Sequence, residues 1–202
     1  MKLTSKKGKG QKLHIYIDDD YKFTTDINTF YLLGLQENEE IDEEKLIFIK
    51  DKIDFSYLYN CAVKILSLRA NSEKELRDKL IKKNRREYVV EEVISKIKEQ
   101  GYLNDEDFAK AYSKELIQKK GKSKNYVSFK LREKGINNSM IDEVLEDYNI
   151  DEKERIEDII QRKYKKVNLN DEKEKRRIYN FFVRAGFKTG DILTVFNKIV
   201  GE

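Results

Sequence analysis

Three segments of equal length decide the fold of this chain: LRDKLIKKNRREYVVEEVISKIKE (76–99), VSFKLREKGINNSMIDEVLEDYNI (127–150) and IYNFFVRAGFKTGDILTVFNKIVG (178–201). Each segment starts 51 residues after the previous one, and the three align without gaps. Apolar residues occupy equivalent positions in all three, first at Leu76, Val127 and Ile178. Self-similarity at such a period is typical of proteins built from stacked copies of one small unit. The chain is therefore expected to use one building block three times.

The spacing within each segment predicts its helices. The second half of the first segment places apolar residues at Val90, Val93, Ile94 and Ile97, which is one face of a helix. An earlier helix stops at a residue that tolerates the left-handed conformation closing a helix. These stops are Asn84, Gly135 and Gly186. Each segment is thus predicted to hold a helix, a turn and a second helix.

A third helix precedes each pair in the same register, which completes a three-helix unit. Each repeat also has a signal for the start of a helix. These signals are Ser72 with Glu75 as a capping box, and Asn104 and Asn170 before acidic residues. Units of this size bury little core alone, so we expect them to pack in series as an elongated, curved array. The predicted domains are an N-terminal extension at 1–55 and three-helix repeats at 56–104, 105–150 and 151–202.

The N-terminal extension is expected to be a small α+β domain. Two alternating segments within 11–24 flank three consecutive aspartates, which predicts a β-hairpin. Residues 26–33 and 42–54 have helical patterns. The lysines among residues 6–12, interleaved with glycines, are interpreted as a mobile basic tail. The fold class is therefore mainly α, with a hairpin-containing domain at the N-terminus.

Composition excludes several classes of protein. Of 202 residues, 40% are charged and 39% hydrophobic, with a mean hydropathy of −0.79. No apolar run approaches the ~18 residues of a membrane span, and the start lacks a secretory signal, so we expect a cytoplasmic chain without membrane contact. One histidine (His14), one cysteine (Cys61) and the absence of nucleotide-binding glycine motifs argue against an enzyme, a cofactor or a metal site. The three aspartates of the hairpin lack the spaced ligands of a calcium loop.

Four sequence motifs, in this order, resemble those of a known family: LSLRANSEKELRDKLIKK (66–83), GYLNDEDFAKAY (101–112), LREKGI (131–136) and RAGF (184–187). Together they resemble the RecX family, the regulators of the RecA recombinase. The resemblance covers about 145 residues from Tyr57 onward, and the N-terminal extension resembles that of members from Gram-positive bacteria. The family often has a Gly-Pro turn where this chain reads KKGKSKN (119–125), and this chain contains no proline.

The resemblance implies a helical, non-enzymatic protein that binds RecA and its filament on DNA. Filament growth, ATP hydrolysis and strand exchange would then be reduced, within recombination, DNA repair and the SOS response. We expect a monomer. The rival hypothesis is a DNA-binding helical module that acts on single-stranded or duplex DNA and displaces RecA by competition.

The basic side chains are the candidate contacts to RecA or DNA. The net charge of +4 and pI near 8.8 fall short of a dedicated nucleic-acid binder but suit work beside a polyanion. The densest cluster lies between two helices of the second repeat, where a solvated loop is the alternative interpretation. The candidates are Arg69, Arg77, Lys82, Lys83, Lys119, Lys120, Lys122, Lys124, Lys130, Arg132, Arg162, Lys163, Lys165, Lys166, Arg176 and Arg177.

Other conspicuous residues are interpreted as structural. Tyr102, Phe108 and Tyr112 have helical spacing and are expected in the core rather than on a base-stacking surface. His14 is expected at the surface of a strand. Cys61 is expected to be an inert residue on the apolar face of its helix.

Overall fold

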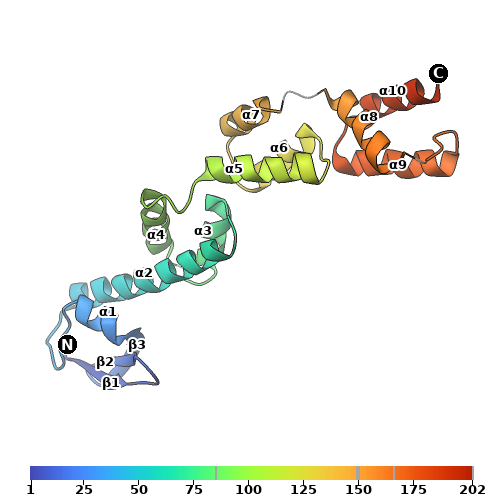
Figure 1. Cartoon of the computed structure of the whole chain (residues 1–202). Helices are drawn as coiled ribbons and strands as arrows, with labels where there is room; N and C mark the ends of the chain where they lie inside the picture. Colours follow the sequence, from blue (N-terminus) through green and yellow to red (C-terminus); the bar gives the residue numbers. More distant parts are fainter. Residues whose placement is uncertain (85, 149–150, 166, 202) are drawn as a thin grey trace. The chain divides into compact units, whose positions relative to one another are not determined.

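The computed structural model describes residues 1–84, 86–148, 151–165 and 167–201 (Figure 1). The chain divides into two compact units. The first contains Met1–Asn71 and Glu75–Leu103, and the second contains Ser72–Lys74 and the chain from Asn104 onward. The described residues are mainly helical, with one small sheet at the N-terminus, which confirms the predicted fold class.

The sheet of the first unit is antiparallel, with strand order β1-β2-β3. Its strands are β1 (Leu3–Lys7), β2 (Lys12–Ile17) and β3 (Asp20–Asp26). Asp18 and Asp19 take left-handed backbone angles, φ 48° and 67°, which aspartate tolerates better than most residues and which a tight hairpin requires. The predicted hairpin is confirmed. The predicted mobile tail is wrong, because residues 3–7 pair along β2 as a third strand.

Two helices follow the sheet, α1 (Ile27–Leu32) and α2 (Glu43–Leu68). Asp26 and Asp42 cap their N-termini by accepting hydrogen bonds from backbone N–H groups. The second helix was predicted to end at 54, but it runs on to Leu68 and is 26 residues long in all. The predicted domain boundary at 55 therefore falls inside a continuous helix, and the division of the chain into four domains stays a prediction.

The later part of α2 packs with α3 (Glu73–Ile81) and α4 (Glu87–Glu99). Leu58, Leu76, Val90 and Val93 are fully buried in their shared core, as the apolar stripe predicts. Tyr102 was expected in a core but is 63% exposed. It follows Gly101, which turns the chain with a φ of 73° just beyond the helix end.

The second unit contains two further helical groups. The first group is α5 (Asp105–Lys114), a one-turn π-helix η1 (Glu115–Lys119), α6 (Lys124–Glu133) and α7 (Asn138–Glu146). Asn104 caps α5, as predicted, by accepting from the N–H groups of Glu106 and Asp107. Phe108 is buried, and the half-buried Tyr112 stacks on it with ring centroids 5.5 Å apart.

The second group is α8 (Glu152–Lys163), α9 (Glu172–Ala185) and α10 (Thr189–Val200). Its core is built around Phe182, a fully buried ring with edge contacts to Phe187 and Phe196. The N-cap of α9 is Asp171 rather than the predicted Asn170, because the aspartate carboxylate accepts from two backbone N–H groups of the first turn. The predicted boundary at 150 lies outside the described residues.

One contact within the second unit recurs with the sequence period. Ser123 N–H donates to the carbonyl of Ala185 at 3.0 Å, and 51 residues earlier Ser72 Oγ donates to the carbonyl of Lys134 at 2.7 Å. The glycine after each carbonyl is left-handed, Gly135 at φ 85° and Gly186 at φ 86°. The two predicted left-handed glycine stops are thus confirmed, whereas Asn84 is not among the described residues with positive φ. The curvature of the array stays a prediction.

Candidate functional site

The predicted basic cluster of the second unit extends from Lys119, the last residue of the π-helix η1, through the turn to Lys124, the first residue of α6. The wider π-helical turn ends at Lys120, and Gly121 then reverses the chain with a φ of 62°. Lys122 N–H donates back to the carbonyl of Leu116 at 3.0 Å, which closes the turn. π-Helical turns are rare and occur frequently at functional sites. The connection between η1 and α6 is therefore a turn closed by a backbone hydrogen bond.

Arg155 joins this turn to α8. Its guanidinium donates to the carbonyl of Ile117 at 3.1 Å and lies 5.7 Å from the ring centre of Phe187. Glu152 lies one turn earlier on the same helix, with its carboxylate 3.7 Å from the guanidinium. The side chain of Arg155 is only 10% exposed, and this burial lowers its pKa from the usual value of arginine. Arginine remains charged at neutral pH in any case, so Arg155 is a buried cation that ties α8 to η1.

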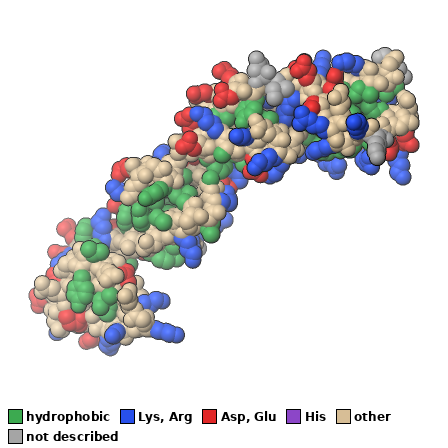
Figure 2. Space-filling model, in the orientation of Figure 1, with side chains coloured by type: hydrophobic (Ala, Val, Ile, Leu, Met, Phe, Trp, Pro, Cys, Tyr) green, Lys and Arg blue, Asp and Glu red, His purple; other side chains and the backbone are tan. Residues whose placement is uncertain are grey.

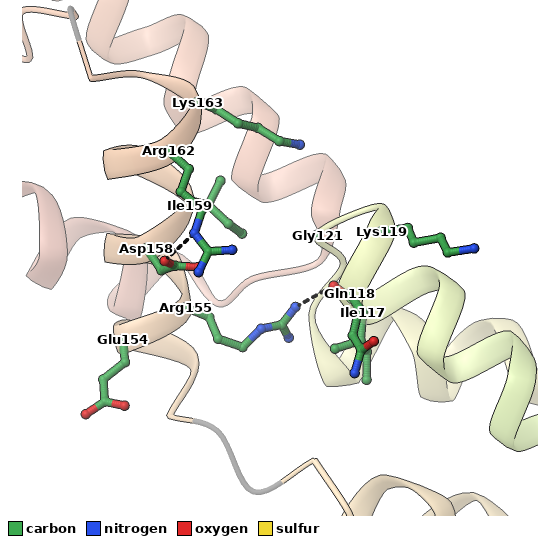
Figure 3. Close-up of a pocket in the computed structure, with 10 residues that line it drawn as sticks. All are labelled: Ile117, Gln118, Lys119, Gly121, Glu154, Arg155, Asp158, Ile159, Arg162 and Lys163. Atoms are coloured by element: carbon green, nitrogen blue, oxygen red, sulfur yellow. Dashed lines mark hydrogen bonds and ion pairs between the residues drawn. The ribbon is translucent and has the colours of Figure 1, made fainter.

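A groove of about 430 Å³ opens beside Arg155 (Figure 3). One wall is formed by η1 and the turn after it, and the other by α8. In Figure 3, Arg155 reaches across from α8 toward Ile117, whereas Glu154 and Lys119 point away from the groove. The lining residues are Ile117, Gln118, Lys119, Gly121, Glu154, Arg155, Asp158, Ile159, Arg162 and Lys163.

Several predicted cations of the second unit already have partners within the chain. Lys120 pairs with Glu115 at 2.7 Å, and this hydrogen bond raises the pKa of the lysine. Lys122 lies 4.5 Å above the ring of Tyr126 and donates to a backbone carbonyl. The remaining partnered cations are Lys130 with Glu133, Arg132 with Asn138 and Arg162 with Asp158. Contacts like these reduce the number of positive charges that are free for a partner.

Other predicted cations carry no ion pair or side-chain hydrogen bond to any residue that the structure describes. Lys163 contacts only an aromatic ring, that of Phe181 at 5.4 Å. Arg176 and Arg177 are exposed on α9, where they line a shallow depression of about 480 Å³ with Glu172, Lys173 and Asn180. The unpartnered predicted cations of the second unit are Lys119, Lys124, Lys163, Lys165, Arg176 and Arg177. Lys166 lies outside the described residues.

The predicted cations of the first unit divide in the same way. Arg69 donates to the carbonyl of Ala70 and pairs with Glu75 at 3.3 Å, so it covers the end of α2. Arg77 makes a two-pronged pair with Glu91, both distances being 2.7 Å. Lys82 and Lys83 are exposed after α3, with no partner among the described residues.

The interleaving of charges is visible on the surface. Figure 2 shows Lys and Arg side chains along the chain, with Asp and Glu side chains between them rather than in a separate region. Among the described residues, neither unit shows a uniformly basic surface in this view. The capacity to bind anions depends on the individual unpartnered cations.

Sequence analysis missed Arg155, Glu152 and Asp158. Each lies in α8. The signal available was spacing: Arg155 directly precedes Ile156, and Ile159 and Ile160 extend the same apolar face. A charged residue beside such a stripe is a candidate for burial against a backbone carbonyl.

Comparison with known proteins now gives the family. A model described as "RecX, second three-helix domain" matches residues 104–145, and one described as "RecX, first three-helix domain" matches residues 59–96. A protein named regulatory protein RecX from Caldanaerobacter subterraneus subsp. tengcongensis is 34% identical over 95% of both chains. The chain belongs to the RecX family. A second RecX, from Clostridium acetobutylicum, is 30% identical over 100% of this chain and 96% of its own.

Solved RecX structures share the fold. A crystal structure titled regulatory protein RecX matches with a TM-score of 0.64 and 22% identity, covering 99% of this chain and 97% of its own. The crystal structure of RecX from Lactobacillus salivarius matches with a TM-score of 0.56 and 24% identity, over 74% of this chain and 98% of its own. The names of the RecX relatives support a regulatory role for this chain.

Two further observations concern the described residues. Within 1–84, 86–148, 151–165 and 167–201, no helix combines the length and apolar character needed to cross a bilayer. The same residues contain no group of three or more His, Cys, Asp or Glu placed to hold a metal ion. His14 is half-buried, with its Nδ1 2.7 Å from Thr24 Oγ1. Cys61 is half-buried and packs against the core that α2 shares with α3 and α4.

Proposed function

We propose that this RecX-family protein acts in the cytoplasm by binding RecA and RecA–DNA filaments, and that it negatively modulates ATP hydrolysis and strand exchange. Family membership supports the regulatory role. RecA is proposed as the partner because the sequence motifs of this chain resemble those of the RecX family. In this proposal inhibition is a consequence of occupancy and needs no chemistry from the chain.

The observation that carries the proposal is the separation of the basic residues into partnered and unpartnered sets. Lys120 and Arg162 are held by Glu115 and Asp158. Lys163 on α8 has no ion pair among the described residues, and neither has Lys119, which lines the opposite wall with its side chain pointing away from the groove. Unpartnered ammonium groups can pair with carboxylates of a protein or phosphates of DNA without first losing an internal partner. We therefore place the binding surface on the second unit, around this groove and the exposed arginines of α9.

Occupancy explains inhibition by a simple physical route. A filament grows only where the next protomer finds a free subunit interface. A helical array that covers such an interface blocks addition, and one that contacts several protomers weakens the contacts between them. Both effects reduce DNA-dependent ATP hydrolysis, because fewer RecA protomers are assembled on the strand.

The second candidate function is DNA binding that displaces RecA by competition, and the same unpartnered cations favour it. Its physical signature differs. Affinity for bare single strands would fall steeply with salt, with a logarithmic slope of roughly 0.7 for each phosphate neutralised. A RecA-directed surface depends on shape as well as charge, so its affinity would fall less steeply.

The decisive experiment compares binding to immobilised RecA, to RecA–single-stranded-DNA filaments and to the bare strand at two salt concentrations. The test variant is Lys119→Gln with Lys163→Gln. The matched control is Lys96→Gln with Lys110→Gln, which removes the same charge from lysines held by Glu99 and Glu106. We expect the test variant to lose about tenfold in affinity for the filament, and the control to lose less than threefold.

The outcomes separate the candidates. Binding to RecA in the absence of DNA supports the proposal. Binding that requires DNA, equals the affinity for the bare strand and follows its salt dependence supports competition instead. Equal losses in the test and control variants would show that net charge alone matters and would contradict the assignment to the groove.

A further inference from the structure

The sheet of the first unit has two edges, and the described residues cover only the β1 edge. At β1 the outward N–H of Leu3 donates to the carbonyl of Glu39 at 2.8 Å, and the outward N–H of Ser5 donates to the carboxylate of Glu37 at 2.9 Å. Lys2 forms an isolated bridge with Glu40. The segment before α2 therefore covers much of this edge, and covering an edge is how proteins commonly protect exposed strands.

The other edge is β3, and its register fixes which groups face outward. In an antiparallel ladder, hydrogen-bonded and non-hydrogen-bonded pairs alternate. Ile27 N–H donates to the carbonyl of Gln11, so Thr25 and Phe23 are the next residues that bond to β2. The backbone N–H and C=O of Thr24 consequently point away from the sheet. Among the described residues, no backbone or side-chain group is recorded as a partner of that N–H.

A groove runs along this edge between β3 and α2, with a volume of about 540 Å³. Its wall carries Thr25, which is only 6% exposed and whose hydroxyl has no hydrogen-bond partner within the described residues. The remaining lining mixes polar side chains with the apolar surfaces of Ile53, Tyr57 and Cys61. The lining residues are Lys12, Thr24, Thr25, Asp26, Thr29, Ile53, Ser56, Tyr57, Asn60, Cys61 and Lys64.

The charges of the groove select a type of occupant. Its one carboxylate, that of Asp26, already accepts from the N–H and hydroxyl of Thr29. Lys12 and Lys64 make no ion pair with a described residue. The two lysines outnumber this single carboxylate, which leaves the groove lining with a net positive charge and favours an acidic occupant.

We propose that the β3 edge binds an extended, acidic segment of another protein by β-strand addition. The backbone of the segment would pair with Thr24, and its acidic side chains would approach Lys12 and Lys64. Strand addition of this kind takes affinity from main-chain hydrogen bonds and specificity from pockets for alternate side chains. This site is separate from the basic groove of the second unit and does not depend on the function proposed above.

The strand limits the length of the site. The register shift between Ile15 and Tyr16 interrupts regular pairing near the start of β3, and Lys22 lies on that part of the strand. Bulges and lysines are devices that discourage strand pairing. The occupant is therefore expected to pair with the last residues of β3, from Phe23 to Asp26.

The test uses the full-length protein and a displayed library of random dodecamer peptides. Enriched peptides are synthesised and titrated against the wild type, Thr24→Pro and Thr24→Ala. Both variants lose the side-chain contacts of Thr24 to His14 and Tyr21, but only proline removes the outward N–H. Proline is tolerated on an edge strand when its missing N–H faced solvent. Circular dichroism checks that both variants fold.

We expect enriched peptides to be acidic and extended, and to bind Thr24→Pro at least tenfold more weakly than Thr24→Ala. Should Thr24→Pro fail to fold, amide exchange in the wild type replaces it, and the Thr24 N–H is expected to become protected when peptide binds. Four results would overturn the proposal: no enriched peptide, a basic or apolar consensus, equal affinity for both variants, or unchanged exchange at Thr24. A dimer that Thr24→Pro dissociates would overturn it too, because a second copy of the chain would then be the occupant.

Discussion

Replacement of Gly186 by alanine tests whether the repeats are joined as the structure indicates. This glycine ends α9 with a φ of 86°, a left-handed conformation that costs a residue with a Cβ about 1–2 kcal/mol. An added Cβ would also lie 2.7 Å from both Ser123 Oγ and Tyr126 Cβ. Both atoms belong to the start of α6, where Ser123 is the N-cap. Tyr126 Cβ cannot move without shifting the helix, and rotation of Ser123 Oγ would break the N-cap bond that it accepts from Tyr126 N–H. Overpacking of this kind typically costs a further ~1–3 kcal/mol.

We therefore expect Gly186→Ala to lower the free energy of unfolding by about 2–5 kcal/mol. Gly101→Ala is the matched control, since Gly101 has a φ of 73° but nothing within 4 Å of an added Cβ. The control isolates the backbone cost, about 1–2 kcal/mol. Urea unfolding followed by circular dichroism gives both values.

Amide exchange at Ser123 provides a second readout, because its N–H donates to the carbonyl of Ala185 in the segment that must shift. We expect exchange at this amide to accelerate in Gly186→Ala and to stay unchanged in Gly101→Ala. Equal destabilisation by the two substitutions, with Ser123 still protected, would refute the reasoning that the turn after α9 packs tightly on α6.

Three further predictions concern stability. Phe182→Ala should lower the free energy of unfolding by about 3–5 kcal/mol in urea titrations, since the ring is fully buried in its core; a loss below about 1 kcal/mol would contradict that packing. Arg155→Met keeps the apolar stem but leaves the carbonyl of Ile117 without its donor, so a loss of about 1–3 kcal/mol is expected. An unchanged unfolding midpoint would count against this anchoring role. Hydrogen bonds from Thr29 lower the pKa of Asp26 below the usual 3.8, so the stability that this carboxylate adds is present above pH 4 and is lost as the pH falls through its folded-state pKa. The stability gap between wild type and Asp26→Asn should therefore shrink between about pH 5 and pH 2 in acid titrations, and a gap that stays constant would show that the carboxylate contributes nothing there.

The helical repeats could be predicted because one periodic signal sets both their secondary structure and their burial. Leu76, Val127 and Ile178 occupy one equivalent position and are all fully buried. A helix of this kind is stabilised mainly by packing of its apolar face, so a stripe of apolar residues predicts both features together. Burial was predicted less reliably at the ends of the repeated segments. Ile199, which is equivalent to the buried Ile97, is 45% exposed because it lies in the last turn of α10.

The N-terminal region was harder to predict for two physical reasons. Strand β1 reads LTSKK, and its lysines point to solvent at an edge, so composition resembled a tail. Pairing with β2 and the segment containing Glu37 stabilises it, and such long-range pairing leaves no local signal. The helix predicted to end at 54 continues as α2 past residue 55. Its packing partners change along its length, from the sheet to the first repeat, and no residue in the sequence marks that this change occurs within one helix.

The candidate site could be predicted only as a set of basic residues. Whether a lysine is free depends on the three-dimensional position of acidic side chains. Lys119 and Lys120 are adjacent in sequence, yet only Lys120 meets Glu115. Arg155 was missed because its role depends on a carbonyl of η1, 38 residues away along the chain. Sequence patterns identify candidate charges, and the fold determines which of them remain available.

The most direct test of the account is the rate of ATP hydrolysis by RecA on single-stranded DNA, titrated with this protein. We predict that wild-type protein slows hydrolysis at less than one copy per RecA, that Lys119→Gln with Lys163→Gln needs about tenfold more protein for the same effect, and that Lys96→Gln with Lys110→Gln behaves as the wild type. Undiminished hydrolysis at equimolar protein, together with undetectable binding to RecA, would contradict it.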